Sequence, residues 1–191
     1  MPAGIKYDLK GQDVEKELYN VKSGYRLAGG FNINDEDIAD GQYIPVLAPL
    51  SIDFKTRTAK VAKSVKAVEN IDNTTLKVQK GSLVKKGMHL GTGSKGATIT
   101  AIDTSNANYD TLTLSATITG VKTGEVLFEA KADTGKDVKN PANFLNYAHV
   151  KKEAGATVTA LGQAYEIQTE KLYAPVSEQD KETLGARFMF I

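Results

Sequence analysis

Few residues in this sequence have the types and spacing that chemistry requires, and the first candidate is a glycine-rich stretch. Gly91, Gly93 and Gly96 form a Gly-x-Gly-x-x-Gly pattern, which is typical of dinucleotide-binding loops. Such a loop must lead directly into a helix, whose N-terminus meets the pyrophosphate. Here residues 97–102 follow, and their β-branched side chains favour a strand. Because no Lys-Ser or Lys-Thr pair follows a glycine at P-loop spacing, we interpret the stretch as a flexible loop between strands.

The histidines and hydroxyl residues show no catalytic pattern. His89 and His149 are the only imidazoles, and neither has acidic neighbours at the spacing of a metal site. We expect each to be solvent-exposed or satisfied within the core. The absence of cysteine excludes disulfides, thiolate metal sites and cysteine nucleophiles. No serine lies in a Gly-x-Ser-x-Gly elbow, so the sequence predicts no catalytic residue, no metal site and no cofactor.

Charged residues give two further candidates, and both are weak. Asp35, Glu36 and Asp37 could hold a hard cation, but they lack the glycine and spaced ligands of an EF-hand loop, so a solvated loop is favoured. The central region is locally basic, but it lacks the interleaved aromatics of single-strand binders. The 24 basic and 23 acidic residues give a net charge of +1, which provides no global field for nucleic acid or an anionic membrane. We therefore expect no nucleic-acid partner.

The elements that must position these residues are organised around residues 111–119. Leu112, Leu114, Ala116 and Ile118 alternate strictly with hydroxyl residues, and this period of two predicts a half-buried strand. A glycine-bounded turn and a second strand at 125–128 follow. The same order of strand, loop and hairpin occurs at residues 75–90. We interpret residues 68–130 as a small antiparallel β module closed by these two units.

The flanking segments predict a second domain that the module interrupts. Residues 26–67 and 141–191 are expected to form an outer β domain, with residues 131–140 as a linker. The apolar stretch 44–50 contains two prolines, so it is expected at a sheet edge or in an ordered crossing loop. Residues 1–25 form a polar, flexible arm that carries Tyr7, Tyr19 and Tyr25. Such an arm can be a frayed terminus or a partner-binding strap, because tyrosine offers amphipathic contact area.

The C-terminal segment has clear helix signals. Ser177 and Asp180 form a Ser-x-x-Asp capping box, and Gly185 stands where a left-handed cap would end a short helix after Leu184. An apolar strand follows at 188–191, and we expect it to be buried in a sheet or a subunit contact. No apolar run approaches the ~20 residues that span a bilayer, and no signal-peptide region is present, so no membrane partner is expected.

Several phrases of the sequence resemble a known family. Residues 83–87, 99–110 and 124–127 are similar to the head fibre proteins of tailed phages and prophages of Bacteroides-type bacteria, and Ile-Thr-Ala-Ile-Asp-Thr-Ser-Asn-Ala at 99–107 is the most specific phrase. Residues 44–50, 160–167 and 175–190 agree, so the resemblance covers about 25–191. The layout of arm, Gly/Pro-rich β segments and terminal helix and strand also resembles, in pattern only, the head decoration proteins of lambda-like phages.

The resemblance implies a structural virion protein without catalytic activity. It implies assembly as a homotrimer and binding to the major capsid protein lattice at the outer capsid surface, after synthesis in the bacterial host cytoplasm. The strand and helix patterns themselves predict a mainly β (β-rich α+β) fold: an outer β domain with one short C-terminal helix and an inserted small, antiparallel, β-barrel-like module. The short chain departs from long receptor-binding fibres and favours a compact decoration or fibre-base role. The candidate capsid contacts are Lys6, Tyr7, Lys10, Leu18, Tyr19 and Tyr25. The possible subunit contacts are Phe188, Met189, Phe190 and Ile191.

Two other classes of function remain as alternatives. A surface adhesin or carbohydrate-binding β module would need a concave face with clustered aromatics, whereas aromatics make up 7% of the chain and Trp is absent. A hydrolase would need a nucleophile and base that the sequence does not reveal.

Overall fold

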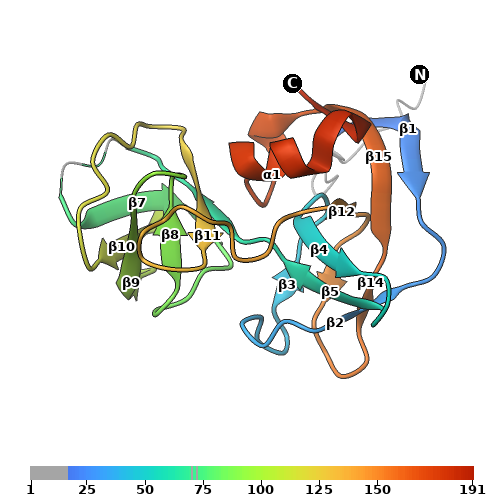
Figure 1. Ribbon diagram of the computed structural model, residues 1–191, viewed down its shortest axis with the longest axis horizontal. Coiled ribbons are helices and arrows are strands. Elements are labelled where there is room, and N and C mark those ends of the chain that lie inside the picture. The colour runs from blue at the N-terminus through green and yellow to red at the C-terminus, as the bar shows by residue number, and fades with distance from the viewer. Residues whose placement is uncertain (1–16, 70, 72) are drawn as a thin grey trace, which may run out of the picture.

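The computed structural model describes residues 17–69, 71 and 73–191, and it shows two β-rich lobes side by side (Figure 1). The larger lobe, here called the outer domain, combines the start and the end of the described chain. The smaller lobe, here called the barrel, consists of consecutive strands between residues 64 and 130. The predicted fold class is confirmed: the fold is mainly β, with one short C-terminal helix and a small antiparallel module inserted in a larger β domain. None of the described helices is long and apolar enough to cross a membrane.

The outer domain is built on an eight-stranded sheet in which most neighbouring strands, the β4–β5 hairpin excepted, are far apart in the sequence. The strand order is β1 (Asn20–Arg26), β15 (Ala160–Ile167), β12 (Phe144–Asn146), β4 (Pro49–Asp53), β5 (Thr58–Val61), β2 (Phe31–Ile33) and β14 (Thr157–Val158), and β16 (Phe188–Phe190) pairs in parallel with β15. The short strands β3 (Tyr43–Ile44) and β13 (Val150–Lys151) form a separate pair. The domain has two apolar clusters, one around Leu161 and Leu184 and the other around Phe31 and Val158.

The proline-containing stretch 44–50 leads into the interior of this sheet. Residues 45–48 form a turn, and β4 then pairs with β12 on one side and with β5 on the other. Pro49 is the first residue of β4, where a missing amide proton is tolerated. Its carbonyl oxygen accepts a hydrogen bond of 2.9 Å from the amide of Ala62. The expectation of a sheet edge was therefore wrong for Pro49, although the turn before it resembles the expected crossing loop.

The barrel is an antiparallel six-stranded sheet that closes on itself. Its order is β6 (Ser64–Lys66), β11 (Val126–Ala130), β8 (His89–Gly91), β9 (Gly96–Asp103), β10 (Tyr109–Leu114) and β7 (Thr75–Gln79). A bridge between Ala67 and Val78 joins the last strand to the first. Leu112, Leu114 and Ile118 from the alternating stretch are buried in the barrel core. The expected strand over 111–119 was too long, because β10 ends at Leu114, and Ala116 is exposed. The Ala67–Val78 bridge brings the two edge strands, β6 and β7, together, and such closure protects sheet edges from edge-to-edge aggregation.

The glycine-rich stretch 91–96 is a loop between β8 and β9, and its glycines serve a close chain crossing. The segment after β11 folds back over this loop, and the amide of Gly93 donates a 2.9 Å hydrogen bond to the carbonyl oxygen of Gly135. A Cβ atom on Gly96 would lie 2.5 Å from the nitrogen of Gly135, closer than real contacts allow. Gly135 itself has φ +68°, a conformation that favours glycine. The pattern therefore reflects backbone packing, and β9 follows where a nucleotide fold needs a helix.

The only α-helix in the described part of the chain, α1 (Glu178–Leu184), forms where it was predicted and has the predicted N-terminal cap. Ser177 Oγ accepts a hydrogen bond from the amide of Asp180 and donates one to the Asp180 carboxylate. Burial raises the pKa of Asp180, and its hydrogen bonds with Ser177 and the amide of Ala142 oppose that shift. Gly185 ends the helix with φ +65° and ψ −165°, which requires glycine but is not the left-handed helical cap that we expected. Two 3-10 turns, η1 (Thr169–Lys171) and η2 (Gly185–Arg187), flank it.

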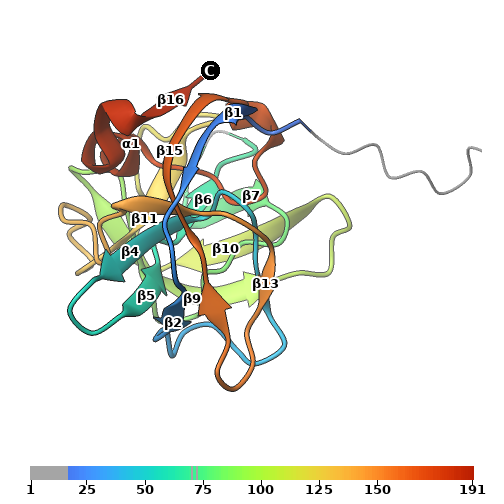
Figure 2. The same ribbon diagram turned by 90° about the vertical axis from the view of Figure 1, so that its right-hand side faces the viewer.

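Two segments lie on the other side of an expected boundary. Residues 64–66 form β6 in the barrel sheet, although they fall within the expected outer segment 26–67. Residues 20–25 fall within the expected arm, but they belong to β1, which pairs with β15 (Figure 2). Both shifts have the same cause, because each segment gains a hydrogen-bonded partner strand that is distant in sequence. Residues 1–16 of the expected arm lie outside the described residues.

Candidate interaction surface

The two groups of predicted contact residues meet on one strand, β15. The amide of Gln168, just after β15, donates a 2.8 Å hydrogen bond to the carbonyl oxygen of Leu18. On the other edge, β16 runs parallel to β15, and the amide of Thr169 donates a 2.9 Å hydrogen bond to the carbonyl oxygen of Ile191. Both ends of the described chain therefore lie at the same end of the outer domain, at the top in Figure 1.

Some of the predicted contact residues are part of the core. Tyr19 and Phe188 are 9% and 5% exposed and belong to the same apolar cluster. Burial raises the pKa of Tyr19, and the nearby Tyr147 adds to the shift. Leu18 and Phe190 are half-buried and pack against this cluster. These side chains therefore pack largely beneath the surface of the outer domain.

Other predicted contact residues are exposed. Tyr25, Met189 and Ile191 are 62%, 45% and 59% exposed. Lys6, Tyr7 and Lys10 lie outside the described residues, so the structure does not place them.

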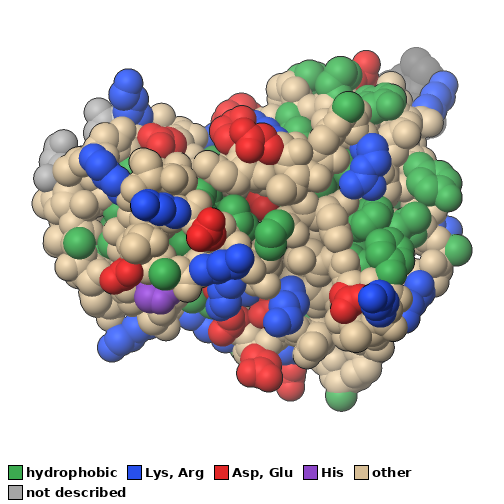
Figure 3. Space-filling model, viewed as in Figure 1, with side chains coloured by type: hydrophobic (Ala, Val, Ile, Leu, Met, Phe, Trp, Pro, Cys, Tyr) green, Lys and Arg blue, Asp and Glu red, His purple; other side chains and the backbone are tan. Residues whose placement is uncertain are grey.

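Sequence reasoning missed two exposed apolar residues of this region. Val21 on β1 is 69% exposed, and Tyr165 on β15 is 37% exposed. Val21 follows Asn20, which pairs with Tyr165, so the two exposed residues belong to the same pair of strands. The space-filling view shows hydrophobic side chains concentrated on the outer domain (Figure 3). No sequence signal pointed to Val21, because residues 20–26 do not alternate between polar and apolar side chains.

The acidic stretch 35–37 is not a simple solvated loop. Asp35 is 4% exposed, and its carboxylate lies 2.8 Å from the ammonium of Lys63, whose side chain is fully buried. The same ammonium lies 3.6 Å from Glu129 of the barrel and 3.9 Å from Asp37. The expectation of solvation was wrong for Asp35, because its partner is buried at the segment that leads into the barrel.

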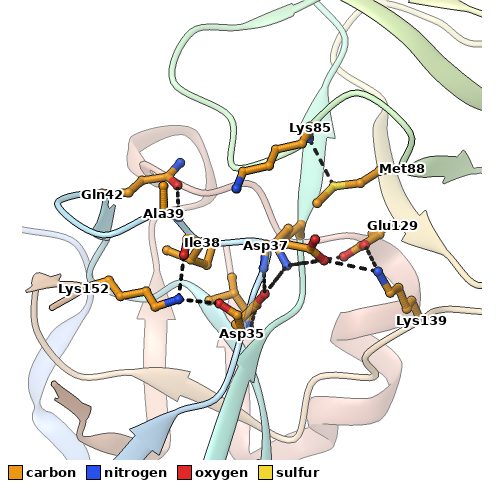
Figure 4. Close-up of polar contacts among 12 residues, drawn as sticks. Asp35, Asp37, Ile38, Ala39, Gln42, Lys85, Met88, Glu129, Lys139 and Lys152 are labelled. Carbon is orange, nitrogen blue, oxygen red and sulfur yellow. Dashed lines mark hydrogen bonds and ion pairs between the residues drawn. The ribbon is translucent and has the colours of Figure 1, made fainter. Parts of the chain in front are cut away.

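A second lysine joins the same acids from the other connection between the lobes. Lys139 lies 2.7 Å from Glu129 and 3.3 Å from Asp37, and Figure 4 shows these side chains converging at the junction. The hydrogen bond to Glu129 raises the pKa of Lys139, and burial opposes that shift. We call Asp35, Asp37, Lys63, Glu129 and Lys139 the junction network. It ties both connecting segments to the same carboxylates and so fixes how the lobes are oriented.

Each histidine forms a hydrogen bond within its own lobe. His89 Nδ1 lies 2.8 Å from the hydroxyl of Thr98, and His149 Nδ1 accepts a 3.3 Å hydrogen bond from the amide of Val46. The His89–Thr98 pair places a hydroxyl beside an imidazole, but no carboxylate among the described residues is hydrogen-bonded to that imidazole to orient it, as a catalytic triad requires. Within the described ranges, no group of three or more His, Cys, Asp or Glu residues could hold a metal ion.

Comparisons with known proteins identify the family. Neither the curated proteins nor the solved structures returned a match to this chain. A family model described as head fiber protein matches residues 3–184, which is nearly the whole sequence and spans both lobes. This match agrees with the β-rich fold and with the resemblance carried by residues 99–107. The chain belongs to the phage head fibre protein family and is therefore a phage structural protein and a component of the virion.

Proposed function

We propose that the protein binds the outer surface of the phage capsid without catalysis and stabilises the assembled particle. Family membership places the chain among phage head proteins. The observation that carries the rest is that one strand pair of the outer domain exposes three apolar residues, Val21 and Tyr25 on β1 and Tyr165 on β15. Exposed apolar residues that gather in one region are typical of protein interfaces.

The proposed partner is the lattice of the major capsid protein. Among the candidate contacts that the structure describes, Tyr25 is the exposed one. Lys6, Tyr7 and Lys10 precede β1 in the chain and would extend the contact. Leu18 and Tyr19 would pack beneath this contact as part of the apolar cluster. A protein that binds the lattice but not free subunits stabilises the lattice by linkage, and many copies would combine weak contacts into a strong effect.

The opposite edge of β15 supports a second contact, between copies of this chain in a homotrimer. Met189 and Ile191 are exposed there, next to the half-buried Phe190. Met189→Asp combined with Ile191→Asp should dissociate the trimer in sedimentation velocity without unfolding the chain. A wild-type chain that sediments as a monomer at all concentrations would rule out this part of the proposal.

The capsid contact is tested with capsids that lack this protein. The double variant Val21→Ser and Tyr25→Ser should bind at least about tenfold more weakly in co-sedimentation, because it removes the central apolar groups of the surface. The matched control is Tyr43→Ser, since Tyr43 is 60% exposed on β3 but lies in a different strand pair. Melting temperatures of all three proteins should agree closely. Unchanged binding by the double variant would disprove the proposed surface.

A truncation tests the arm separately from the sheet. A chain that starts at Glu17 keeps all of β1, so its melting temperature should match the full chain. Its capsid binding should be weaker if Lys6, Tyr7 and Lys10 contact the lattice. Full binding by the truncated chain would assign the contact to β1 and β15 alone.

A further inference from the structure

A cavity of about 400 Å³ lies at the junction between the barrel and the outer domain. Its lining includes Lys85, Lys86, His89 and Lys131 from the barrel side, together with Glu129 and Lys139 of the junction network. Figure 3 shows Lys and Arg side chains gathered near the line where the two lobes meet. The cavity is distinct from the apolar surface on β1 and β15.

The lining carries an excess of positive charge. It contains four lysines and two carboxylates, so its formal charge is +4 − 2 = +2 with neutral histidine. Both carboxylates are already paired, because Asp37 and Glu129 lie within ion-pair distance of Lys139 and of the buried Lys63. None of the ion pairs within residues 17–69, 71 and 73–191 includes Lys85, Lys86 or Lys131. Among the described residues, these three ammonium groups therefore have no carboxylate partner.

The backbone holds these lysines on ordered elements. Lys85 and Lys86 lie in a tight turn, in which the amide of Met88 donates a 3.2 Å hydrogen bond to Lys85 O and the amide of Lys85 lies 3.1 Å from the sulfur of Met88. Lys131 follows β11 directly, and its amide donates a 2.9 Å hydrogen bond to Asp137 O. Like charges held in one concave site repel one another, and a bound anion would relieve that repulsion.

We propose that this cavity is a binding site for an oxyanion group, such as a sulfate or phosphate ester. Its volume suits a small polar group, since ligand sites begin at about 300 Å³. Its lining contains no Phe, Tyr or Trp, the side chains on which neutral sugars usually stack. Lysine ammonium groups bind oxyanions as point charges, and their attraction weakens with added salt. The site does not depend on the proposed capsid contact, because its residues lie on different strands.

Isothermal titration of the full chain tests this site, with inorganic sulfate, glucose 6-sulfate and glucose 6-phosphate as probes and glucose as the neutral control. The wild-type chain should bind the charged probes saturably and glucose not at all, with affinity that falls as salt rises. Equal binding of inorganic sulfate and the sugar esters would assign a site for the anion alone. Tighter binding of the esters would assign a site for a charged saccharide.

Two charge-neutralising variants locate the binding. Lys85→Gln combined with Lys86→Gln should weaken binding at least about tenfold, since it removes two of the point charges that hold the anion. The control, Lys122→Gln, changes an exposed barrel lysine that does not line the cavity, and its affinity should stay within about twofold of wild type. No saturable binding by the wild-type chain, or equal weakening by both variants, would overturn the proposal. Because all the lysines changed lie at the surface or partly exposed, both variants should fold.

Discussion

The outer domain and the barrel solve the same problem, the pairing of strands, in opposite ways. The barrel pairs strands that all lie between residues 64 and 130 and closes completely, with its own core. The outer domain pairs β1 near the start of the chain with β15 near its end and leaves apolar side chains exposed. A closed barrel with its own core is complete as it stands, whereas a sheet that exposes apolar residues is suited to a partner. The difference separates a self-contained lobe from the lobe that we propose binds the capsid.

The two lobes are not fully independent, however. Leu83 belongs to the barrel segment, but it is 8% exposed within an apolar cluster of the outer domain. Glu129 at the end of β11 lies beside Lys63 and Lys139. We propose that the barrel folds by itself, because its strands pair only with one another, and that the outer domain gains stability from its contacts with Leu83 and Glu129.

The largest test of this comparison is to remove the barrel. Deletion of residues 69–130 with a short Gly-Ser linker should leave an outer domain that still unfolds cooperatively, since its two clusters lie largely outside the deleted segment. Its melting temperature should fall, because Leu83 and Glu129 are lost. Differential scanning calorimetry measures both effects. A deletion variant without any cooperative transition would show that the two lobes share one core.

The next test breaks the junction network. Lys63→Ala leaves Asp35 and Glu129 buried without their shared cation, and removal of one partner from a buried ion pair costs about 3–5 kcal/mol. Urea unfolding at neutral pH should show a loss of that size. The control is Lys60→Ala, because Lys60 is exposed on β5 and forms no ion pair within the described residues. A similar small effect in both variants would mean that the network contributes little.

A smaller effect is expected at Asp180 in the outer domain, and its sign follows from the raised pKa. The folded state binds this proton more tightly than the unfolded state, so the contribution to stability is full below the unfolded pKa of about 3.9 and is lost as pH rises through the folded pKa. Asp180→Asn should remove this loss, and its melting temperature should therefore change less than that of wild type as pH rises above about 4.

Asp53 provides the control of opposite sign. Backbone hydrogen bonds from Lys55 and Thr56 lower the pKa of Asp53, so its contribution to stability is present above the unfolded pKa and is lost as pH falls. In wild type, ionisation of Asp53 should raise the melting temperature as pH rises, and Asp53→Asn should lack this gain. Identical pH profiles for the two Asn variants would contradict both assignments.

The smallest effect is expected from the histidines. Replacement of His89 and His149 by Gln should leave capsid stabilisation intact, since we propose a function without catalysis. The measurement is release of genome from heated particles that carry each variant. An essential histidine in this assay would argue for a chemical role, with the His89–Thr98 pair as the first place to look.

The sequence predicted best what depends on neighbouring residues. The alternation at Leu112 and Leu114 and the cap at Ser177 are local, and both formed as predicted. The pairing of β1 with β15 could not be predicted, because the partners are distant and residues 20–26 do not alternate. The burial of Asp35 could not be predicted for the same reason, because its ion-pair partner Lys63 is distant in the sequence and lies beside it only in the folded chain. The candidate contact residues show the same limit. The sequence predicted contacts at both ends of the chain, but it did not predict which of these side chains are exposed.

The meeting of both chain ends has a mechanical consequence. Lys171 donates a hydrogen bond to the carbonyl oxygen of Glu17, and Thr169 donates one to Ile191, so the two ends of the described chain are held at η1. The chain enters the barrel at β6 and leaves it at β11, and these two strands are neighbours, since Ser64 pairs with Phe128. Tension applied between residues 17 and 191 would load β1 and β16 first, and the barrel would keep its shape until the outer sheet had opened.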